Sequence, residues 1–346
     1  MTRFVTLDPG RALPPEAMGL APLVTLDDIR ASAHRLRGIA MRTPLVEFAA
    51  GPPRIVLKAE SLQAIGAFKI RGAYNAIAQL SPEERRRGVV THSSGNHAQG
   101  VARAAWILGV RATVVMPEDA PVVKRERVAA DGAEIVTVGV ESGAREAMAN
   151  RLVEERDLVL IPPYDDDRVI AGQGTCGLEI AEDVPDLALV LVPIGGGGLA
   201  SGIAAAVRAL RPTARIIGVE PELAADAAES LEAGRIMRWD GAATARTIAD
   251  GTRTQAIGAR PFEHLSRLLD GIVTVSEIEI AVAMRLAAER SRLIVEPSGA
   301  LSLSAAHFHA RELDLDQMTG TVVAVVSGGN VDPERYRSLL ETPDPT

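Results

Sequence analysis

Three lysines, Lys58, Lys69 and Lys124, are the only side-chain amines in this chain, so any Schiff-base chemistry must use one of them. The other strongly basic side chains are arginines, which cannot act as amine nucleophiles at neutral pH. Lys69 has the most informative surroundings, because it follows a turn at Gly66 and precedes an alanine-rich segment that predicts a helix. A lysine at a helix start is unfavourable with the helix dipole. This placement allows a cofactor-facing amine, but for this segment alone a solvated surface lysine is the better explanation.

A second candidate segment runs from Ser93 to His97 and contains two serines, a glycine, an asparagine and a histidine. It lies between a predicted strand at 88–90 and a predicted helix at 98–103. Free backbone N–H groups at a helix N-terminus bind carboxylates well. A simple helix cap would need only one serine, so the segment indicates a loop that contacts substrate or cofactor.

Two glycine-rich segments also follow predicted strands. Gly195 to Gly198 come after the strand at 188–192 and before a predicted helix, so their amides could surround a phosphate. Glu220 ends the next predicted strand, which keeps a dinucleotide-binding interpretation open. The segment 327–330, Ser-Gly-Gly-Asn, follows the apolar strand at 322–326 and could be a plain turn or part of the same crevice.

Strand-like runs alternate with helical segments along most of the chain, which is typical of an α/β fold. The apolar runs lack polar alternation, so we expect open, mostly parallel sheets flanked by helices, with ligands at the carboxyl ends of the strands. The segment Pro162-Pro163-Tyr164, followed by three aspartates, is a candidate passage between lobes. The clearest predicted strands are 55–57, 88–90, 112–115, 134–137, 188–192, 215–219 and 322–326.

The predicted domain organisation has three parts. Residues 1–24 show no periodicity and are expected to form an N-terminal arm. A first amphipathic helix begins after the capping residue Thr25. A large domain is expected over 25–87 and 165–340, and a small domain over 88–164.

Composition limits the function classes. The chain has 346 residues, a net charge of -8 and one cysteine, Cys176. The charge argues against nucleic-acid or polybasic membrane binding, and one cysteine cannot form an internal disulfide. We find no secretion signal and no apolar run of about eighteen residues. These features favour a cytoplasmic enzyme that acts on a small molecule.

In order along the chain, these motifs resemble the fold-type II family of pyridoxal-phosphate (PLP) enzymes, and most closely its threonine and serine dehydratases and serine racemases. The resemblance runs from about Thr25 to about Val331. It also includes the segments 42–45 (Arg-Thr-Pro-Leu), 248–251 (Ile-Ala-Asp-Gly) and 296–300 (Glu-Pro-Ser-Gly-Ala). It implies a fold like that of the tryptophan synthase β subunit, with two open, mostly parallel sheets and the cofactor in the crevice between the domains.

The resemblance also implies a role for each motif. Lys69 would bind PLP as a Schiff base, Asn96 would contact its phenolic oxygen, and Ser327 would face its pyridine nitrogen. A neutral hydroxyl at that position favours β-elimination over a long-lived carbanion. The freed Lys69 amine would then remove the Cα proton of the substrate. The implied cofactor contacts are Phe68, Lys69, Asn96, Gly195, Gly196, Gly197, Gly198, Gly251, Glu296, Ser327 and Gly328, and the implied substrate contacts are Ser93, Ser94, Gly95, Asn96 and His97.

The implied reaction is dehydration and deamination of L-threonine or L-serine to a 2-oxo acid and ammonium, catalysed by an ammonia-lyase that is a homodimer in this family. Ser94 matches the acid/base residue of serine racemases, so racemisation stays open, as does hydroxyaspartate as a substrate. Glu220, Ala224 and Asp226 resemble a divalent-cation site for Mg²⁺, Ca²⁺ or Mn²⁺. On spacing alone, a solvated acidic loop would explain these three residues as well.

Some residues depart from the family pattern. Ala67 stands where a serine or threonine usually precedes the Phe-Lys pair, and Ala64-Ile65 replaces a commonly polar pair. The side chain of the substrate is therefore left open. No regulatory domain follows Thr346, so we expect no feedback by isoleucine. A regulatory protein that binds nucleotides without catalysis is the alternative from another class.

Overall fold

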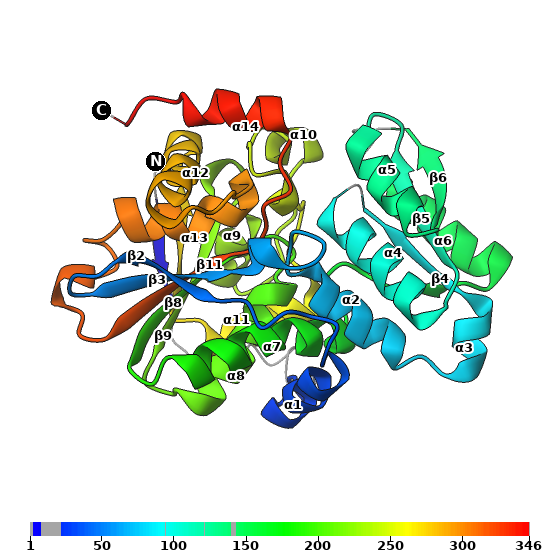
Figure 1. Cartoon of the computed structure of the whole chain (residues 1–346), viewed down its shortest axis with the longest axis horizontal. Helices are drawn as coiled ribbons and strands as arrows, with labels where there is room; N and C mark the ends of the chain where they lie inside the picture. Colours follow the sequence, from blue (N-terminus) through cyan, green and yellow to red (C-terminus); the bar gives the residue numbers. More distant parts are fainter. Residues whose placement is uncertain (1–2, 8–21, 94, 121, 140–142, 346) are drawn as a thin grey trace.

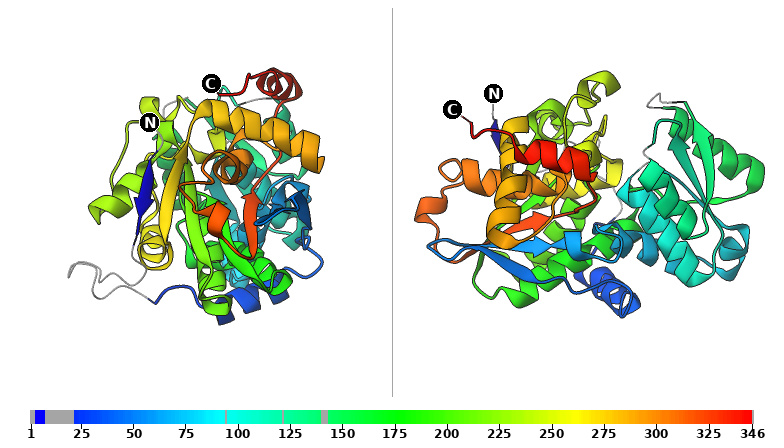
Figure 2. Two further views of the ribbon diagram at one scale, coloured as in Figure 1. Left: turned by 90° about the vertical axis from the view of Figure 1, so that its left-hand side faces the viewer. Right: turned by 45° about the horizontal axis from the view of Figure 1, so that its top comes forward.

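Two mainly parallel sheets, each in its own lobe, organise the molecule (Figure 1). The computed structural model describes residues 3–7, 22–93, 95–120, 122–139 and 143–345. Both β1 near the N-terminus and the C-terminal helix α14 (Pro333–Leu340) lie on the larger lobe, away from the smaller one (Figures 1 and 2). In the described part of the chain, no helix is both long enough and apolar enough to cross a membrane.

The large lobe contains a seven-stranded sheet in the order β1-β10-β9-β8-β11-β3-β2. Its inner strands are parallel, and only the two edge pairs, β1 with β10 and β2 with β3, are antiparallel. The strands are β1 (Phe4–Thr6), β2 (Leu45–Ala49), β3 (Arg54–Ala59), β8 (Leu187–Pro193), β9 (Arg215–Pro221), β10 (Gly271–Val275) and β11 (Thr321–Val326).

The small lobe contains a four-stranded parallel sheet in the order β6-β5-β4-β7. Its strands are β4 (Val89–His92), β5 (Ala112–Pro117), β6 (Glu134–Val138) and β7 (Val159–Leu160). The two sheets together confirm the predicted α/β class.

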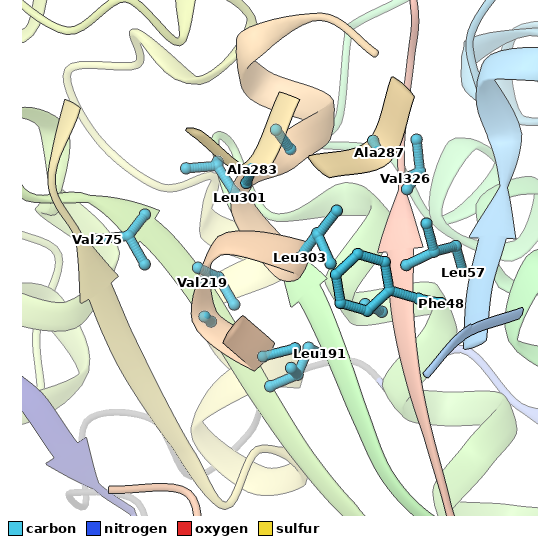
Figure 3. Close-up of a cluster of buried hydrophobic side chains, with 14 of the residues drawn as sticks. Phe48, Leu57, Leu191, Val219, Val275, Ala283, Ala287, Leu301, Leu303 and Val326 are labelled. Carbon is cyan, nitrogen blue, oxygen red and sulfur yellow. The ribbon is translucent and has the colours of Figure 1, made fainter. Parts of the chain in front are cut away.

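Helices cover both faces of the large sheet, which explains why its strands are apolar without alternation. Along β8, Leu189 and Leu191 pack into one hydrophobic cluster, whereas Val190 and Val192 pack into another on the opposite face. Figure 3 shows the first cluster, where Leu191 and Val219 of the sheet meet Leu303 of an overlying helix. The covering helices are α12 (Glu277–Ser291) and α13 (Pro297–Phe308) on this face, and α7 (Asp167–Asp183), α8 (Gly198–Leu210), α9 (Asp226–Ala233) and α11 (Ala259–Leu268) on the other.

Helix α1 (Leu26–Arg35) begins where the sequence predicts it. Thr25 and Asp28 form a reciprocal capping box, and Ile29 is buried in a small cluster against α7 and α8. The large lobe also contains the short helix α10 (Gly241–Thr244) and the 3₁₀ turns η2 (Glu60–Leu62), η3 (Glu222–Ala224), η4 (Asp250–Thr252) and η5 (Leu315–Gln317).

Helix α2 (Lys69–Ala78) lies at the junction of the two lobes (Figure 1). It packs against α7 of the large lobe and against α4 (Asn96–Leu108) of the small lobe. Ile70, Ala73 and Ile77 belong to the same hydrophobic cluster as Val89 of the small sheet. The remaining helices of the small lobe are α3 (Pro82–Arg87), α5 (Val122–Ala130) and α6 (Ala144–Arg156).

Two features differ from the expected organisation. The predicted arm includes an edge strand, β1, which is too short to show periodicity in the sequence. Helix α2 falls within the predicted large domain but contributes to the core of the small lobe, because both of its sides are buried. The small sheet itself lies within 88–164, and the boundary residues stay predictions.

Candidate active site

Lys69 is the first residue of α2, and its amine faces the segment that joins the lobes. Lys69 Nζ donates to the carbonyl oxygen of Pro163 at 2.7 Å and lies 5.0 Å from the centre of the Phe68 ring. Burial lowers the pKa of Lys69 to about 8, because the charged amine loses hydration there. About a tenth of this amine is therefore neutral at pH 7 and about half at pH 8, far more than for an ordinary lysine.

The turn before Lys69 is joined to the loop that follows β11. Phe68 N donates to Ser327 O at 3.1 Å, and Gly329 N donates to Gly66 O at 2.9 Å. Between them, Ala67 forms an isolated antiparallel bridge with Gly328. Segments far apart in sequence are thereby fixed side by side, as the crevice hypothesis requires.

A chain of polar side chains connects α4 to this loop. Asn96 Nδ2 donates to Glu296 Oε1 at 2.6 Å, and Asn330 Nδ2 donates to Asn96 Oδ1 at 2.9 Å. Burial, together with the negative charge of Asp250, raises the pKa of Glu296 to about 8. Glu296 is thus largely uncharged at neutral pH, and Asn96 is held at the crevice by partners on the large lobe.

The four consecutive glycines form the turn between β8 and α8, and their surroundings leave no room for side chains. A Cβ on Gly196 would overlap the ring of Tyr164, and one on Gly198 would lie 3.0 Å from Tyr164 Cα. Gly197 has φ +91° and precedes the first residue of α8. This close-packed loop at a helix N-terminus fits a phosphate group. Gly251 lies beside Gly195, with its N–H donating to Ser298 Oγ at 2.7 Å.

Ser327 follows the last residue of β11 and is 5% exposed. Its hydroxyl donates a long, 3.5 Å contact to Ser298 O. The same Ser298 binds Gly251, so Ser327 and Gly251 share a neighbour. The shared contact with Ser298 places Ser327 near Gly251. Gly328, the residue after Ser327, accepts a hydrogen bond from Glu296 N at 3.1 Å, so Glu296 is also close.

Ser93 and Gly95 precede α4, which begins at Asn96, and Ser93 Oγ accepts from Gly95 N at 3.2 Å. His97 turns inward instead of facing a substrate: its Nε2 lies 3.0 Å from Ile161 O. Burial, and then the nearby Lys69 charge, lower the pKa of His97 to about 3. His97 is therefore neutral and contributes backbone rather than side chain to the loop. Ser94 lies outside the described residues, so its acid/base role stays a prediction.

The proposed cation ligands converge between β9 and α9. Glu220 accepts from Ala227 N at 3.0 Å and from Ala228 N at 2.8 Å, while Asp226 Oδ2 has no partner in the described part of the chain. Burial and mutual repulsion raise the pKa of Glu220 well above its ordinary range, and burial raises that of Asp226 to about 7. Ala224 is buried next to them. Over the described ranges, no three His, Cys, Asp or Glu side chains gather, so a cation here would need the Ala224 carbonyl as a ligand.

The other two lysines are engaged elsewhere. Lys58 is fully buried and donates to Glu179 at 2.6 Å, and Lys124 pairs with Asp250 at 3.1 Å across the two lobes. Lys69 is therefore the lysine whose amine lies at Pro163, next to the Tyr164 that packs on the glycine loop.

Sequence reasoning missed three contributors to this site. Pro163 supplies the acceptor for Lys69, Tyr164 packs on the glycine loop, and Asn330 binds Asn96. Pro163 and Tyr164 lie in the segment expected to pass between the lobes, and Asn330 is the last residue of the motif at 327–330. Their roles depend on contacts between distant segments, which a single sequence does not display.

Comparison with known proteins identifies the family. Residues 37–328 match the family described as pyridoxal-phosphate dependent enzyme, so this chain belongs to that family. The predicted family resemblance is thereby confirmed, and a PLP enzyme replaces the nucleotide-binding alternative. The roles of the individual motif residues stay predictions. The carboxylate of Glu220, engaged with the amides of α9, is also not free for a ribose.

Several relatives that match the chain over about nine-tenths of its length are ammonia-lyases or serine racemases. The chain is 41% identical over 321 residues to an L-threo-3-hydroxyaspartate ammonia-lyase of Saccharomyces cerevisiae, covering 91% of this chain and 96% of the relative. It is 40% identical to a serine racemase of Schizosaccharomyces pombe, covering 92% and 98%. The solved structure of a serine racemase from maize matches with 38% identity and a TM-score of 0.85, covering 92% and 97%. A solved threonine deaminase matches with 46% identity and a TM-score of 0.82, covering 89% and 99%.

Proposed function

We propose that this chain is a PLP-dependent ammonia-lyase that converts L-threonine or L-serine to a 2-oxo acid and ammonium. The contacts that join the segments of Lys69, the glycine loop at 195–198, Asn96 and Ser327 carry this proposal. Relatives named as threonine and hydroxyaspartate ammonia-lyases support the same reaction class.

The residues present fit the cofactor. Gly195 to Gly198 would hold its phosphate, Asn96 would contact its phenolic oxygen, and Ser327 would face its ring nitrogen. PLP supplies an electron sink for the bonds at Cα. A hydroxyl at Ser327, instead of a carboxylate, would supply no charged partner for a protonated ring nitrogen and would favour elimination of the β-substituent.

The chain's own residues would then orient and deprotonate the substrate. The amides at the start of α4 would bind its carboxylate. Lys69, with its pKa lowered to about 8, would take the Cα proton, and the same proton could leave with the β-hydroxyl as water. The released enamine would then react with water to give the 2-oxo acid and ammonium.

The test is a substrate panel with purified protein. We expect an absorbance band of lysine-bound PLP near the visible edge, lost in Lys69→Ala, and 2-oxo acid from L-threonine or L-serine. The matched control Lys124→Ala, at a partly exposed lysine, should keep the band. No band in the wild-type protein would contradict the proposal.

The same panel separates the alternatives on this scaffold. L-threo-3-hydroxyaspartate is included because two relatives carry that name. Predominant D-serine from L-serine would identify a racemase, which is the name of another relative. Ser94→Ala should remove D-serine while leaving the lyase reaction largely intact.

Three finer features belong to the same proposal. Glu220, Asp226 and the carbonyl of Ala224 would bind Mg²⁺, Ca²⁺ or Mn²⁺, since a cation would neutralise two buried carboxylates that have no basic partner among the described residues. A cytoplasmic homodimer is the expected form. Exposed Met41 and Ile294 offer apolar surface for such a dimer, which light scattering would test.

A further inference from the structure

Arg71 lies two residues after Lys69 in the first turn of α2. Two residues correspond to about 200° around a helix, so the two side chains leave α2 on opposite sides. Lys69 Nζ donates to Pro163 O in the segment between the lobes, whereas Arg71 is 1% exposed and binds Glu60 and Glu179 of the large lobe. The position of the Lys69 amine therefore depends on how Arg71 holds the other side of the helix.

Arg71 is bound by two carboxylates in a fork-like arrangement. Its Nε and Nη2 donate to the two oxygens of Glu60 at 2.8 Å each, and its Nη1 and Nη2 donate to the two oxygens of Glu179 at 2.6 and 2.9 Å. Nη1 also donates to Thr175 Oγ1 at 3.0 Å, and Nη2 donates to Met41 O at 3.0 Å. Bidentate pairs of this kind fix orientation as well as distance.

Lys58 completes a buried cluster of two cations and two carboxylates, here called the Arg71 cluster: Lys58, Glu60, Arg71 and Glu179. Lys58 Nζ donates to Glu179 at 2.6 Å and to Thr43 O at 2.7 Å. Both carboxylates have cationic partners, so the cluster offers no free group to a ligand. Its members belong to α2, α7, β3 and the turn η2, and α2 is the element that carries Lys69.

The opposite side of α2 is held by packing that has little directionality. Gly100 of α4 lies so close that a Cβ there would be 3.1 Å from Lys69 O. The apolar contacts between α2 and α4 oppose separation of the two helices. They oppose rotation of α2 less, because hydrophobic burial depends on the area buried and not on direction. The first turn of α2 also has directional hydrogen bonds from Phe68 N to Ser327 O at 3.1 Å and from Gly72 N to Gln173 Oε1 at 3.2 Å. Among these contacts, the charged fork is the one made by a side chain of the turn itself, and it adds four hydrogen bonds to two carboxylates.

We propose that Arg71 is a positioning residue that sets the place of the Lys69 amine for its reaction with PLP and substrate. A displacement of about 1 Å at a reacting group can reduce a rate about a hundredfold. The inference rests on the proposed role of Lys69, and it assigns Arg71 no contact with cofactor or substrate.

The main experiment compares Arg71→Lys with Lys58→Met. Arg71→Lys keeps the charge but removes the fork, whereas Lys58→Met removes a cation of the same cluster from β3 without touching α2. Cofactor-free protein is mixed with PLP across pH 6 to 10, and the growth of the absorbance band is followed. We expect Arg71→Lys to slow band formation about tenfold to a hundredfold, with kcat falling more than KM rises. Folded Lys58→Met should react within about twofold of the wild-type protein.

A double variant separates position from stability. Arg71→Met with Glu60→Gln removes one cation and one carboxylate and leaves the Lys58–Glu179 pair. Its unfolding midpoint should recover relative to Arg71→Met alone, but its reaction with PLP should stay slow. A rate that recovers together with stability would overturn the proposal, and so would equal slowing in Lys58→Met.

A second measurement does not depend on PLP. Labelling of Lys69 by an amine-acylating reagent, followed by mass spectrometry, gives its reactivity against pH. We expect Arg71→Lys to shift the midpoint by about half a pH unit, which is about a threefold change in reactive amine, or to change the plateau rate. An unchanged profile would reject the role of Arg71, whereas a wild-type protein that binds PLP but consumes no amino acid would reject only the proposed substrates.

Discussion

Two groups of buried carboxylates in the large lobe have opposite electrostatic settings. In the Arg71 cluster, Glu60 is fully buried, yet the Arg71 charge and its hydrogen bonds outweigh desolvation and lower the pKa of Glu60. In the acid pair, Glu220 and Asp226 are equally buried, but their pKa values are raised. Burial is the same in both places, so the cationic partners make the difference.

This difference in pKa indicates that the Arg71 cluster has a structural role, whereas the acid pair is a candidate binding site. A buried charge cluster that is internally neutral has no need of a ligand and can serve to fix a helix. In the acid pair, Asp226 Oδ2 has no hydrogen-bond partner among the described residues. A divalent cation bound there would neutralise the two buried carboxylates. The comparison can be tested by changing one carboxylate in each place.

The largest expected effect is the loss of a carboxylate from the Arg71 cluster. Glu60→Gln leaves two buried cations, Lys58 and Arg71, with a single carboxylate, Glu179, and should lower the free energy of unfolding by about 3–5 kcal/mol. The matched change Asp226→Asn, made without divalent cations, should not lower it and should raise it near pH 7, because a buried charge and its repulsion with Glu220 are removed. Urea unfolding in EDTA measures both, and equal losses would break the comparison.

A cation should stabilise only the acid pair. At a Mg²⁺ concentration about a hundred times its dissociation constant, the wild-type protein should gain about 2.7 kcal/mol in unfolding free energy. Asp226→Asn should lose this gain, whereas Arg42→Ala, near the Arg71 cluster, should keep it. Thermal scans with Mg²⁺, Ca²⁺ and Mn²⁺ against EDTA give the measurement, and an equal gain in Asp226→Asn would place the cation elsewhere.

The two groups should also differ in the sign of their pH dependence. The lowered pKa of Glu60 contributes stability above pH 4.5 that is lost as pH falls through the folded-state pKa. The pKa of Asp226, raised from 3.8 to about 7, makes cation-free protein lose stability as pH rises between those values. One such group contributes a slope of at most about 1.4 kcal/mol per pH unit. Subtracting the unfolding profile of Asp226→Asn from that of the wild-type protein isolates this slope, which should vanish in Mg²⁺.

The smallest effect concerns an exposed ion pair near the Arg71 cluster. Arg42 donates to Asp183 at 2.6 Å and to Glu182 at 3.0 Å, but its side chain is 50% exposed. Solvent screens such pairs, so Arg42→Ala should cost about 0.2–1 kcal/mol. Urea unfolding at low and high salt tests this, and a loss comparable to that of Glu60→Gln would show that burial is not what makes the Arg71 cluster strong.

Much of the fold followed from local patterns. The apolar runs at 188–192, 215–219 and 322–326 became β8, β9 and β11, because strands covered on both faces must be continuously apolar. β1 escaped detection because three residues cannot show a period, and its pairing with β10 depends on a distant segment. The double role of α2 was hidden for the same reason, since one sequence does not reveal which neighbours bury the two sides of a helix.

For the site, the sequence by itself determined the chemical groups: Lys69 at a helix start, the glycine loop at 195–198, Asn96 and Ser327, in the order that resembles PLP enzymes. Only the tertiary structure decided their states. It made Lys69 a low-pKa amine, turned His97 inward, and gave Glu60 a cationic partner that Glu220 lacks. The physical reason is that residue type and order are local properties, whereas pKa and orientation depend on burial and on charges that only folding brings together.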